Sequence, residues 1–381
     1  MEARRAVLVH DWLTGYRGGE KCLERLAHRW PTAPLLTLFH VRGSTPPIIE
    51  DRRIVTSFLQ RWPGIKDCYR FLLPFFPLAA RWPIPPCDLV VSLSHCVAKS
   101  VKPPPGVPHV CYCFTPMRYA WHMRDSYFGP GRFGRLPSAA VSQILSWLRK
   151  WDAATADRVT HFIAISETVR SRIAECYGRE SAVIYPPVDT HFYTPTSVPR
   201  EDYYLVVSAF APYKRIDLAL AACRELGRKL VVIGSGQDER RLRAAAGPHV
   251  EFLGWQPDEA IRDHLRRCRA LLFPGEEDFG VVPLEAQACG APVIAYGRGG
   301  ATETVVAPVG RADPTGLLFR DQSVDCLTES MAWFERHANE FDPWAARRQA
   351  LHFNPRRFDA EFERFLRSID RPVSLPIRRA A

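Results

Sequence analysis

The chain has 381 residues, of which 46% are hydrophobic, and a formal net charge of +10 at pH 7. This length predicts two domains of roughly 150 to 190 residues each, because a single hydrophobic core seldom grows much larger. The basic excess favours anionic partners such as sugar phosphates or an acidic membrane surface. No dense basic block, zinc-finger spacing or RNA-binding signature occurs, so nucleic acid is not an expected partner.

The eleven cysteines are scattered along the chain. No export signal is recognisable, so we expect reduced thiols and a cytoplasmic protein. Cys111 and Cys113 could supply half of a metal site, but no second pair at zinc spacing follows. Packing as small apolar side chains is favoured, and no metal is expected. The longest apolar segment, residues 71–80, is too short to span a bilayer and contains two prolines.

The first expected element is a buried parallel strand at residues 6–9. A loop over 10–19 and a helix over 20–30 follow. Gly18 and Gly19 at the start of that helix allow the backbone to approach an anion closely. A plain tight turn explains the same pair, and the dinucleotide-binding spacing G-x-G-x-x-G is absent.

Residues 57–86 mix aromatic and basic side chains. The aromatic ones are Phe58, Trp62, Tyr69, Phe71, Phe75, Phe76 and Trp82, and the basic ones are Arg61, Lys66, Arg70 and Arg81. Such a mixture suits the surface of an anionic membrane. The alternative is a helical hairpin that packs the rings inward.

Further strands are predicted at residues 88–92 and 109–113. Shortly after the second strand comes Arg118, whose guanidinium can bind a phosphate or an acidic sugar through two hydrogen bonds. A strand at 159–165 then leads to a helix for which Ser166 is the expected N-cap. Two prolines at 186–187 and a linker-like stretch continue neither kind of element, so we expect the domain boundary here.

The second half repeats the alternation of strand and helix. Strands are predicted at 203–208, 229–233, 250–255, 270–273, 291–295 and 317–319, and helices at 216–226, 281–289, 325–337 and 359–369. Lys214 and Arg215 lie in the first strand-to-helix loop, where cations can meet a diphosphate. Gly234 opens a Gly-Ser-Gly turn after the next strand.

The acidic loop after residue 273 is the strongest candidate site. It follows a strand in a βαβ unit, where open α/β sheets bind ligands. Backbone N–H groups of Phe279, Gly280 and Val281 lie at a helix N-terminus and attract phosphate. Glu285 lies inside that helix among residues expected to be buried, so its carboxylate needs a partner. Glu277 and Glu285 could together hold the hydroxyls of one ligand.

The block over residues 271–303 resembles the E-x7-E signature of retaining glycosyltransferases of family four, which have the GT-B fold. The resemblance covers the acid pair, the Phe-Gly step, the Gly-Ala-Pro-Val-Ile strand and the later Gly-Gly-Ala-Thr-Glu. The segment around Phe114 is similar to a mannosyltransferase-like subgroup of bacterial polysaccharide assembly.

This resemblance implies an α/β fold of two Rossmann-like parallel-sheet domains that face a deep cleft. Residues 1–190 would form the acceptor-side domain and 191–352 the domain that binds the nucleotide sugar. Residues 353–381 would form a helix that crosses back to the first domain, followed by a basic tail.

The same resemblance implies retaining transfer of a hexose from a nucleotide diphosphate sugar, with no metal or other cofactor. The implied donor is GDP-mannose, with UDP-glucose as the alternative. The implied acceptor is a glycan or a polyprenyl-diphosphate-linked glycan at the inner face of the cell membrane. Glu277 would hold the transferred sugar, Glu285 the ribose, and Lys214 with the Gly18-Gly19 turn the diphosphate.

Two positions depart from the family pattern. Phe114 stands where the family has a histidine, and Ala209 stands where it has an arginine. His95 or His122 are the alternatives for the first role, and Arg215 or Arg17 for the second. These departures motivate two other functions, a non-catalytic nucleotide-sugar or glycan-binding protein and a GT-B sugar-nucleotide epimerase.

Overall fold

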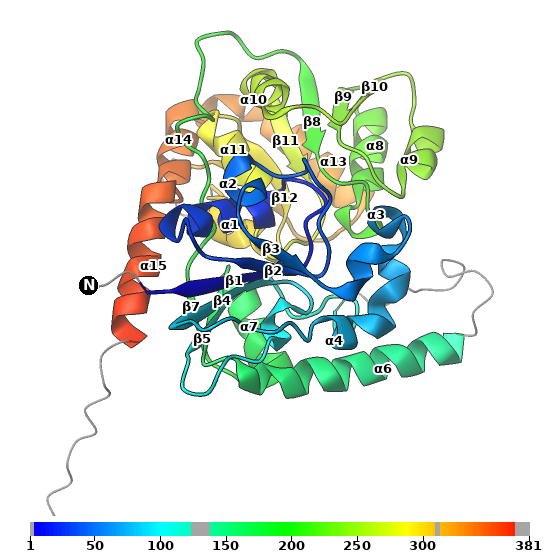
Figure 1. Ribbon diagram of the computed structural model, residues 1–381. Helices are drawn as coiled ribbons and strands as arrows, with labels where there is room; N and C mark the ends of the chain where they lie inside the picture. The colour runs from blue at the N-terminus through cyan, green and yellow to red at the C-terminus, as the bar shows by residue number, and fades with distance from the viewer. Residues whose placement is uncertain (1–3, 123–137, 309–312, 370–381) are drawn as a thin grey trace, which may run out of the picture.

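The computed structural model describes residues 4–122, 138–308 and 313–369. The chain forms two α/β domains, each built on a parallel sheet (Figure 1). The first sheet has seven strands in the order β3-β2-β1-β4-β5-β6-β7, and the second has six in the order β10-β9-β8-β11-β12-β13. The expected fold of two Rossmann-like parallel-sheet domains is therefore confirmed.

The strands of the first sheet are β1 (Ala6–His10), β2 (Leu35–Thr37), β3 (Ile54–Thr56), β4 (Leu89–Ser94), β5 (His109–Cys113), β6 (His161–Ala164) and β7 (Ser181–Val183). The α-helices of this half are α1 (Gly18–Arg29), α2 (Pro47–Glu50), α3 (Ile65–Cys68), α4 (Phe76–Ala79), α6 (Ser138–Thr155) and α7 (Glu167–Tyr177). Its 3-10 segments are η1 (Phe58–Arg61), η2 (Tyr69–Phe75), η3 (Ala98–Ser100) and η4 (Ala156–Arg158).

The strands of the second sheet are β8 (Tyr203–Val207), β9 (Lys229–Ile233), β10 (Val250–Gly254), β11 (Ala270–Phe273), β12 (Val293–Tyr296) and β13 (Gly316–Phe319). The α-helices are α8 (Ile216–Glu225), α9 (Glu239–Ala245), α10 (Asp258–Arg267), α11 (Val281–Ala288), α12 (Ala301–Thr304), α13 (Val324–Arg336), α14 (Pro343–Leu351) and α15 (Pro355–Ile369). Two 3-10 segments, η5 (Pro212–Lys214) and η6 (Ala338–Glu340), complete this half.

The central strands are buried on both faces, which explains why they read as unbroken apolar runs in the sequence. In β1, Leu8 packs on one side of the sheet with Leu26 of α1. Val7 and Val9 point to the other side and share a core with Phe76 of α4. Successive side chains of a strand alternate between faces, so one short run supplies two cores.

The last helix, α15, returns to the first domain, as expected. Figure 1 shows it running beside the N-terminal end of β1. Its Phe358, Phe362 and Leu366 are buried in the same core as Leu8 of the first sheet. Outside that core, Arg29 of α1 donates to Glu363 of α15 at 3.2 Å. Helix α15 therefore packs on the first domain, although it follows the second domain in the sequence.

The aromatic and basic segment forms short helical pieces, η1, α3, η2 and α4, and buries only part of its rings. Phe76 and Trp82 are buried, whereas Phe58, Trp62, Phe71 and Phe75 are between 46% and 64% exposed. The hairpin alternative thus holds for some rings and not for others. Within the described parts of the chain, no helix combines the length and the apolar character that crossing a bilayer requires.

The crossing of α15 can be tested at Phe358, which is fully buried and meets the Tyr112 ring edge-to-face at 5.7 Å. Phe358→Ala should lower the free energy of unfolding by about 3–5 kcal/mol, because it removes a buried ring and leaves a cavity. Urea unfolding measures the change. Trp344→Ala is the matched control, since Trp344 is 62% exposed and its loss should cost less than about 0.5 kcal/mol. Equal effects of the two substitutions would contradict the packing of α15.

Candidate functional site

The carboxyl ends of both sheets meet at the loop that follows β11. A β-carbon placed on Gly18, at the start of α1, would lie only 3.5 Å from the Val281 side chain at the start of α11. The N-termini of two helices from different domains therefore approach each other here. Their first-turn N–H groups have no partner within their own helices.

The acidic loop rests on a pair of glycines. The Gly300 N–H donates to the Glu277 carbonyl at 2.8 Å. A β-carbon on Gly299 would lie 2.2 Å from the Glu277 carbonyl oxygen, and one on Gly300 would lie 2.2 Å from Phe279 Cα. Any side chain at either position would displace the loop, so the glycine pair sets the position of the acids.

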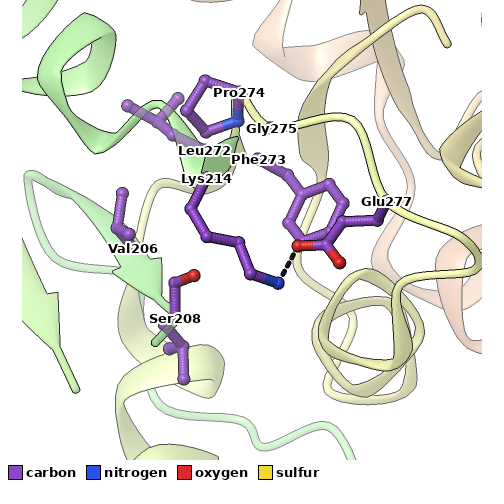
Figure 2. A pocket seen from close by; sticks show the side chains of 9 residues that line it. Val206, Ser208, Lys214, Leu272, Phe273, Pro274, Gly275 and Glu277 are labelled. Atoms are coloured by element: carbon purple, nitrogen blue, oxygen red, sulfur yellow. Dashed lines mark hydrogen bonds and ion pairs between the residues drawn. The ribbon is translucent and has the colours of Figure 1, made fainter. Parts of the chain in front are cut away.

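Lys214 and Glu277, two of the predicted site residues, lie in contact. Figure 2 shows the Lys214 amine directed at the Glu277 carboxylate in a pocket at the carboxyl ends of β8 and β11. The residues that line it are Val206, Val207, Ser208, Lys214, Leu272, Phe273, Pro274, Gly275 and Glu277. Gly275 permits the approach, since a β-carbon there would lie 2.8 Å from Lys214 Cα.

The buried position of Lys214 makes a positive charge on its amine costly. Burial lowers the pKa of Lys214, and the positive charges of Arg118 and Arg17 lower it further, while Asp278 acts in the opposite direction. The adjoining Glu277 carboxylate also favours the charged amine. A buried cation of this kind is stabilised by any further negative group that enters the pocket.

Asp278 connects the two domains. The residue is 2% exposed. Its carboxylate accepts hydrogen bonds from both Arg118 and Arg172 of the first domain. Ser166 Oγ donates to the Asp278 carbonyl at 2.5 Å. Arg172 also bonds Glu276 at 3.0 Å. Arg118 thus lies in the site, where its partner is a carboxylate of the loop.

Glu285 has the partner that its buried position demands. Lys21 of α1 lies 3.5 Å from Glu285 and 3.0 Å from Asp258. Burial raises the pKa of Glu285, while Lys21 and a hydrogen bond with Tyr193 lower it. Glu285 does not line the pocket that holds Glu277. The two glutamates therefore lie in separate environments, each beside a lysine.

Phe279, Gly280 and Val281 form the entry to α11. Gly280 has φ of +85°, which suits glycine, and a β-carbon there would lie 3.0 Å from the Phe273 ring. The Phe279 ring is buried and stacks on Tyr185 at 5.6 Å. The side chain of Phe279 is thus a packing group, so any ligand contact from this residue would come from its backbone.

The remaining predicted residues divide into two groups. Arg215 bonds Asp217 at 3.2 Å and Gln322 at 3.2 Å, so its guanidinium is already engaged. Arg17, in contrast, is close enough to Lys214 to lower its pKa. Gly234 has φ of +132°, and a β-carbon there would lie 1.9 Å from the Ser208 carbonyl oxygen. It therefore shapes the wall of the pocket beside Ser208.

Several residues of the interface were not identified from the sequence. Three of them form contacts between the domains, namely Lys21 with Glu285, Arg172 with Glu276, and Glu303 with the start of α7. Glu303 accepts the N–H groups of Glu167 at 2.8 Å and Thr168 at 3.0 Å, at the start of α7. Only Glu303 had a sequence signal, since it ends the Gly-Gly-Ala-Thr-Glu segment. Across the described residues, no group of three or more His, Cys, Asp or Glu is arranged to hold a metal ion.

The arrangement gathers cations, two helix N-termini and three buried carboxylates, those of Glu277, Asp278 and Glu285, at one interface between domains. Cations and N–H groups bind a polyanion, and carboxylates accept hydrogen bonds from hydroxyls. The site is thus equipped for a ligand that is both phosphorylated and rich in hydroxyls.

Two family descriptions match successive halves of the chain. Glycosyltransferase Family 4 matches residues 16–192, and glycosyl transferases group 1 matches residues 190–347. Among curated proteins, an uncharacterized glycosyltransferase of Methanocaldococcus jannaschii is 27% identical over 41% of this chain and 45% of its own length. A GDP-mannose-dependent alpha-(1-6)-phosphatidylinositol monomannoside mannosyltransferase of Mycolicibacterium smegmatis is 30% identical over 46% of this chain and 52% of its own length. The chain thus spans about half the length of these relatives.

Solved structures of similar fold cover nearly the whole chain. Anabaena HepE in complex with UDP and glucose has a TM-score of 0.68 at 16% identity, covering 96% of this chain and 100% of that one. Sucrose-phosphate synthase of Thermosynechococcus elongatus has a TM-score of 0.69 at 15% identity, covering 96% and 99%. At this identity the likeness establishes the fold.

The glycine support of the acidic loop can be tested with Gly300→Ala. The added methyl group would overlap Phe279 backbone atoms, which lie 2.2 Å and 2.5 Å from its position. Backbone must move to relieve the overlap, so the unfolding free energy should fall by about 1–3 kcal/mol. Denaturant unfolding measures it. In Gly15→Ala the nearest atom is Arg17 Nε at 3.8 Å, so this control should unfold like the unmodified protein; a neutral Gly300→Ala would refute the close packing.

Proposed function

Because the chain belongs to the GT-B glycosyltransferases of family 4 and group 1, we propose that it transfers a hexose from a nucleotide diphosphate sugar with retention at the anomeric carbon. The observation that carries the proposal is the contact of Lys214 with Glu277, beside the N-terminus of α11. The lysine can bind a diphosphate, and the carboxylate can accept hydrogen bonds from the hydroxyls of a sugar joined to that diphosphate. Residues 1–190 would bind the acceptor and 191–352 the donor, with 353–381 as the crossover helix and tail.

GDP-mannose is the proposed donor. The mycobacterial relatives are described as GDP-mannose-dependent mannosyltransferases, and the segment around Phe114 resembles a mannosyltransferase subgroup. UDP-glucose is the alternative donor, because the structurally similar HepE has been solved with UDP-glucose. The proposed acceptor is a glycan or a polyprenyl-diphosphate-linked glycan.

The chemical barrier is the departure of a nucleoside diphosphate, on which negative charge builds up. Lys214, Arg17 and the N–H groups at the starts of α1 and α11 would stabilise that charge in a site with little water. With these groups in place, the reaction is proposed to require no metal. Arg118, which is held by Asp278, would add a further positive charge beside Lys214. Glu277 would hold the transferred sugar, and Glu285 the ribose.

The transfer proposal can be tested with Glu285→Ala. Transfer of labelled mannose from GDP-mannose to a lipid extract should fall about 100-fold or more, since two hydrogen bonds to a charged acceptor contribute about 1.5–3 kcal/mol each. Glu329→Ala, at an exposed position of α13, is the control and should retain transfer. Near-normal transfer by Glu285→Ala would refute the role of this carboxylate.

The same assay separates the alternative functions. A non-catalytic binding protein would raise its melting temperature with GDP or UDP sugars by mass action but form no product. An epimerase would convert the donor sugar in the absence of the lipid extract. Either result would overturn the transferase proposal.

We further propose a peripheral location at the inner, cytoplasmic face of the cell membrane. Five apolar side chains of this segment are between 46% and 64% exposed, namely Phe58, Trp62, Phe71, Phe75 and Leu78. Exposed Arg61, Lys66 and Arg81 lie in the same segment. Exposed rings enter the interface between headgroups and acyl chains, and the cations are attracted by anionic lipids.

Vesicle co-sedimentation tests this location. The unmodified protein should bind phosphatidylglycerol vesicles, and less so at high salt because ions screen the attraction. Trp62→Ser with Phe71→Ser should weaken binding by at least about tenfold, since burying each ring contributes about 1.5–3 kcal/mol. Trp344→Ser is the control in the second domain. Failure of the unmodified protein to bind at low salt would contradict the membrane proposal.

A further inference from the structure

A buried carboxylate holds one histidine of the first domain in a fixed orientation. Asp11, directly after β1, is fully buried and accepts the N–H groups of the next segment after β4. These are the N–H groups of His95, Cys96, Val97 and Ala98, at distances of 2.6 to 3.0 Å. His95 Nδ1 also lies 2.9 Å from Asp11 Oδ2. Both oxygens of the carboxylate are thus used to position residues 95–98.

The charge of Asp11 is stable in this setting. Burial alone would raise the pKa of Asp11, but the positive field and hydrogen bonds of His95, together with His10, lower it to about 2. The carboxylate therefore remains an acceptor at neutral pH, and His95 Nδ1 donates to it. This leaves Nε2 as the ring atom that can meet another molecule.

The ring of His95 is confined but accessible. The Trp12 ring stands edge-on to it at 4.5 Å, and the Phe114 ring lies at 6.5 Å. The His95 side chain is nevertheless 32% exposed. Among the residues that the structure describes, no hydrogen bond to its Nε2 is found. A ring fixed on one side and open on the other is arranged for a ligand rather than for packing.

His95 lies close to the proposed diphosphate site. A β-carbon on Gly19 would lie 3.5 Å from the Phe114 ring, and one on Gly18 would lie 3.5 Å from Val281 at the start of α11. The Phe114 ring therefore links His95 to the meeting point of the two helix N-termini. These contacts place His95 on the first-domain side of the point where the two helices begin. Phe114 itself has no hydrogen-bonding atom, whereas His95 has one.

We propose that His95, oriented by Asp11, binds a hydroxyl of the transferred sugar through Nε2. This inference rests on the proposed function, and it adds a substrate-binding residue from the first domain to a donor site built mainly by the second. His122, the other histidine considered from the sequence, lies 3.4 Å from Cys176 Sγ of α7 and is thus engaged elsewhere.

The test compares substitutions that keep the shape of the ring with substitutions that keep a polar atom. His95→Phe preserves a planar ring but cannot form a hydrogen bond, and kcat/KM for GDP-mannose should fall about 10-fold or more. His95→Gln retains a polar atom and should recover part of the loss. GDP affinity, measured by calorimetry, should stay within about twofold in both, because GDP lacks the sugar whose hydroxyl His95 is proposed to bind. A purely structural role would instead reduce GDP affinity and transfer together.

A second variant relocates the polar atom. Adding Phe114→His to His95→Phe places an imidazole at the neighbouring position and should restore transfer in part. His28→Ala is the matched control, since His28 is exposed near the end of α1 that points away from the site. Transfer by His95→Phe within twofold of the unmodified protein would overturn the role of His95 alone. Absence of transfer by the unmodified protein would instead overturn the proposed function.

Discussion

The structure depends on the pairing of the buried acidic loop with cations from several elements. Glu276, Glu277 and Asp278 are consecutive, and each is bonded to at least one Arg or Lys. Three consecutive carboxylates repel one another, and the two that are buried, Glu277 and Asp278, would be costly to bury without partners. Their partners lie on both sides of the domain interface. The loop can therefore adopt this position only when the two domains are in contact.

Local backbone chemistry and long-range charge pairing thus act on the same few residues. The glycine pair at 299–300 lets the loop sit directly on the turn after β12, and Gly280 lets the chain turn into α11. Once the backbone is fixed, the Asp278 carboxylate pairs with Arg118 and Arg172 of the first domain. A change in the glycine contacts would therefore disturb the ion pairs of the loop, and a change in the ion pairs would disturb its backbone.

The sequence predicted those parts of the fold that depend on local apolar patterns. The strands at 109–113, 229–233 and 270–273 coincide with β5, β9 and β11. Helix α6 was not predicted, because the face it buries is partly polar. Its Asp152 and Thr155 are buried and bond Lys99, which comes from a distant part of the chain. A pattern of apolar residues cannot reveal a helix that is held by such a network.

For the candidate site, too, the sequence predicted the local features and missed the long-range partners. Its loop, its glycines and the requirement of Glu285 for a partner follow from local sequence. The identity of that partner does not, because Lys21 and Glu285 are 264 positions apart. Arg118 and Arg172 likewise meet Asp278 across 160 and 106 positions. Partners this distant depend on the packing of both domains, so a single sequence gives no local signal for them.

The neighbouring acids Glu277 and Asp278 differ in a way that bears on ligand entry. Both Glu277 and its partner Lys214 belong to the second domain, so this pair can exchange partners without any movement of the domains. The partners of Asp278 belong to the first domain, and breaking those contacts would separate the two halves. A diphosphate at Lys214 would replace one negative partner by another and release Glu277 toward the sugar hydroxyls. The loop can therefore keep the domains together through Asp278 while Glu277 changes its partner.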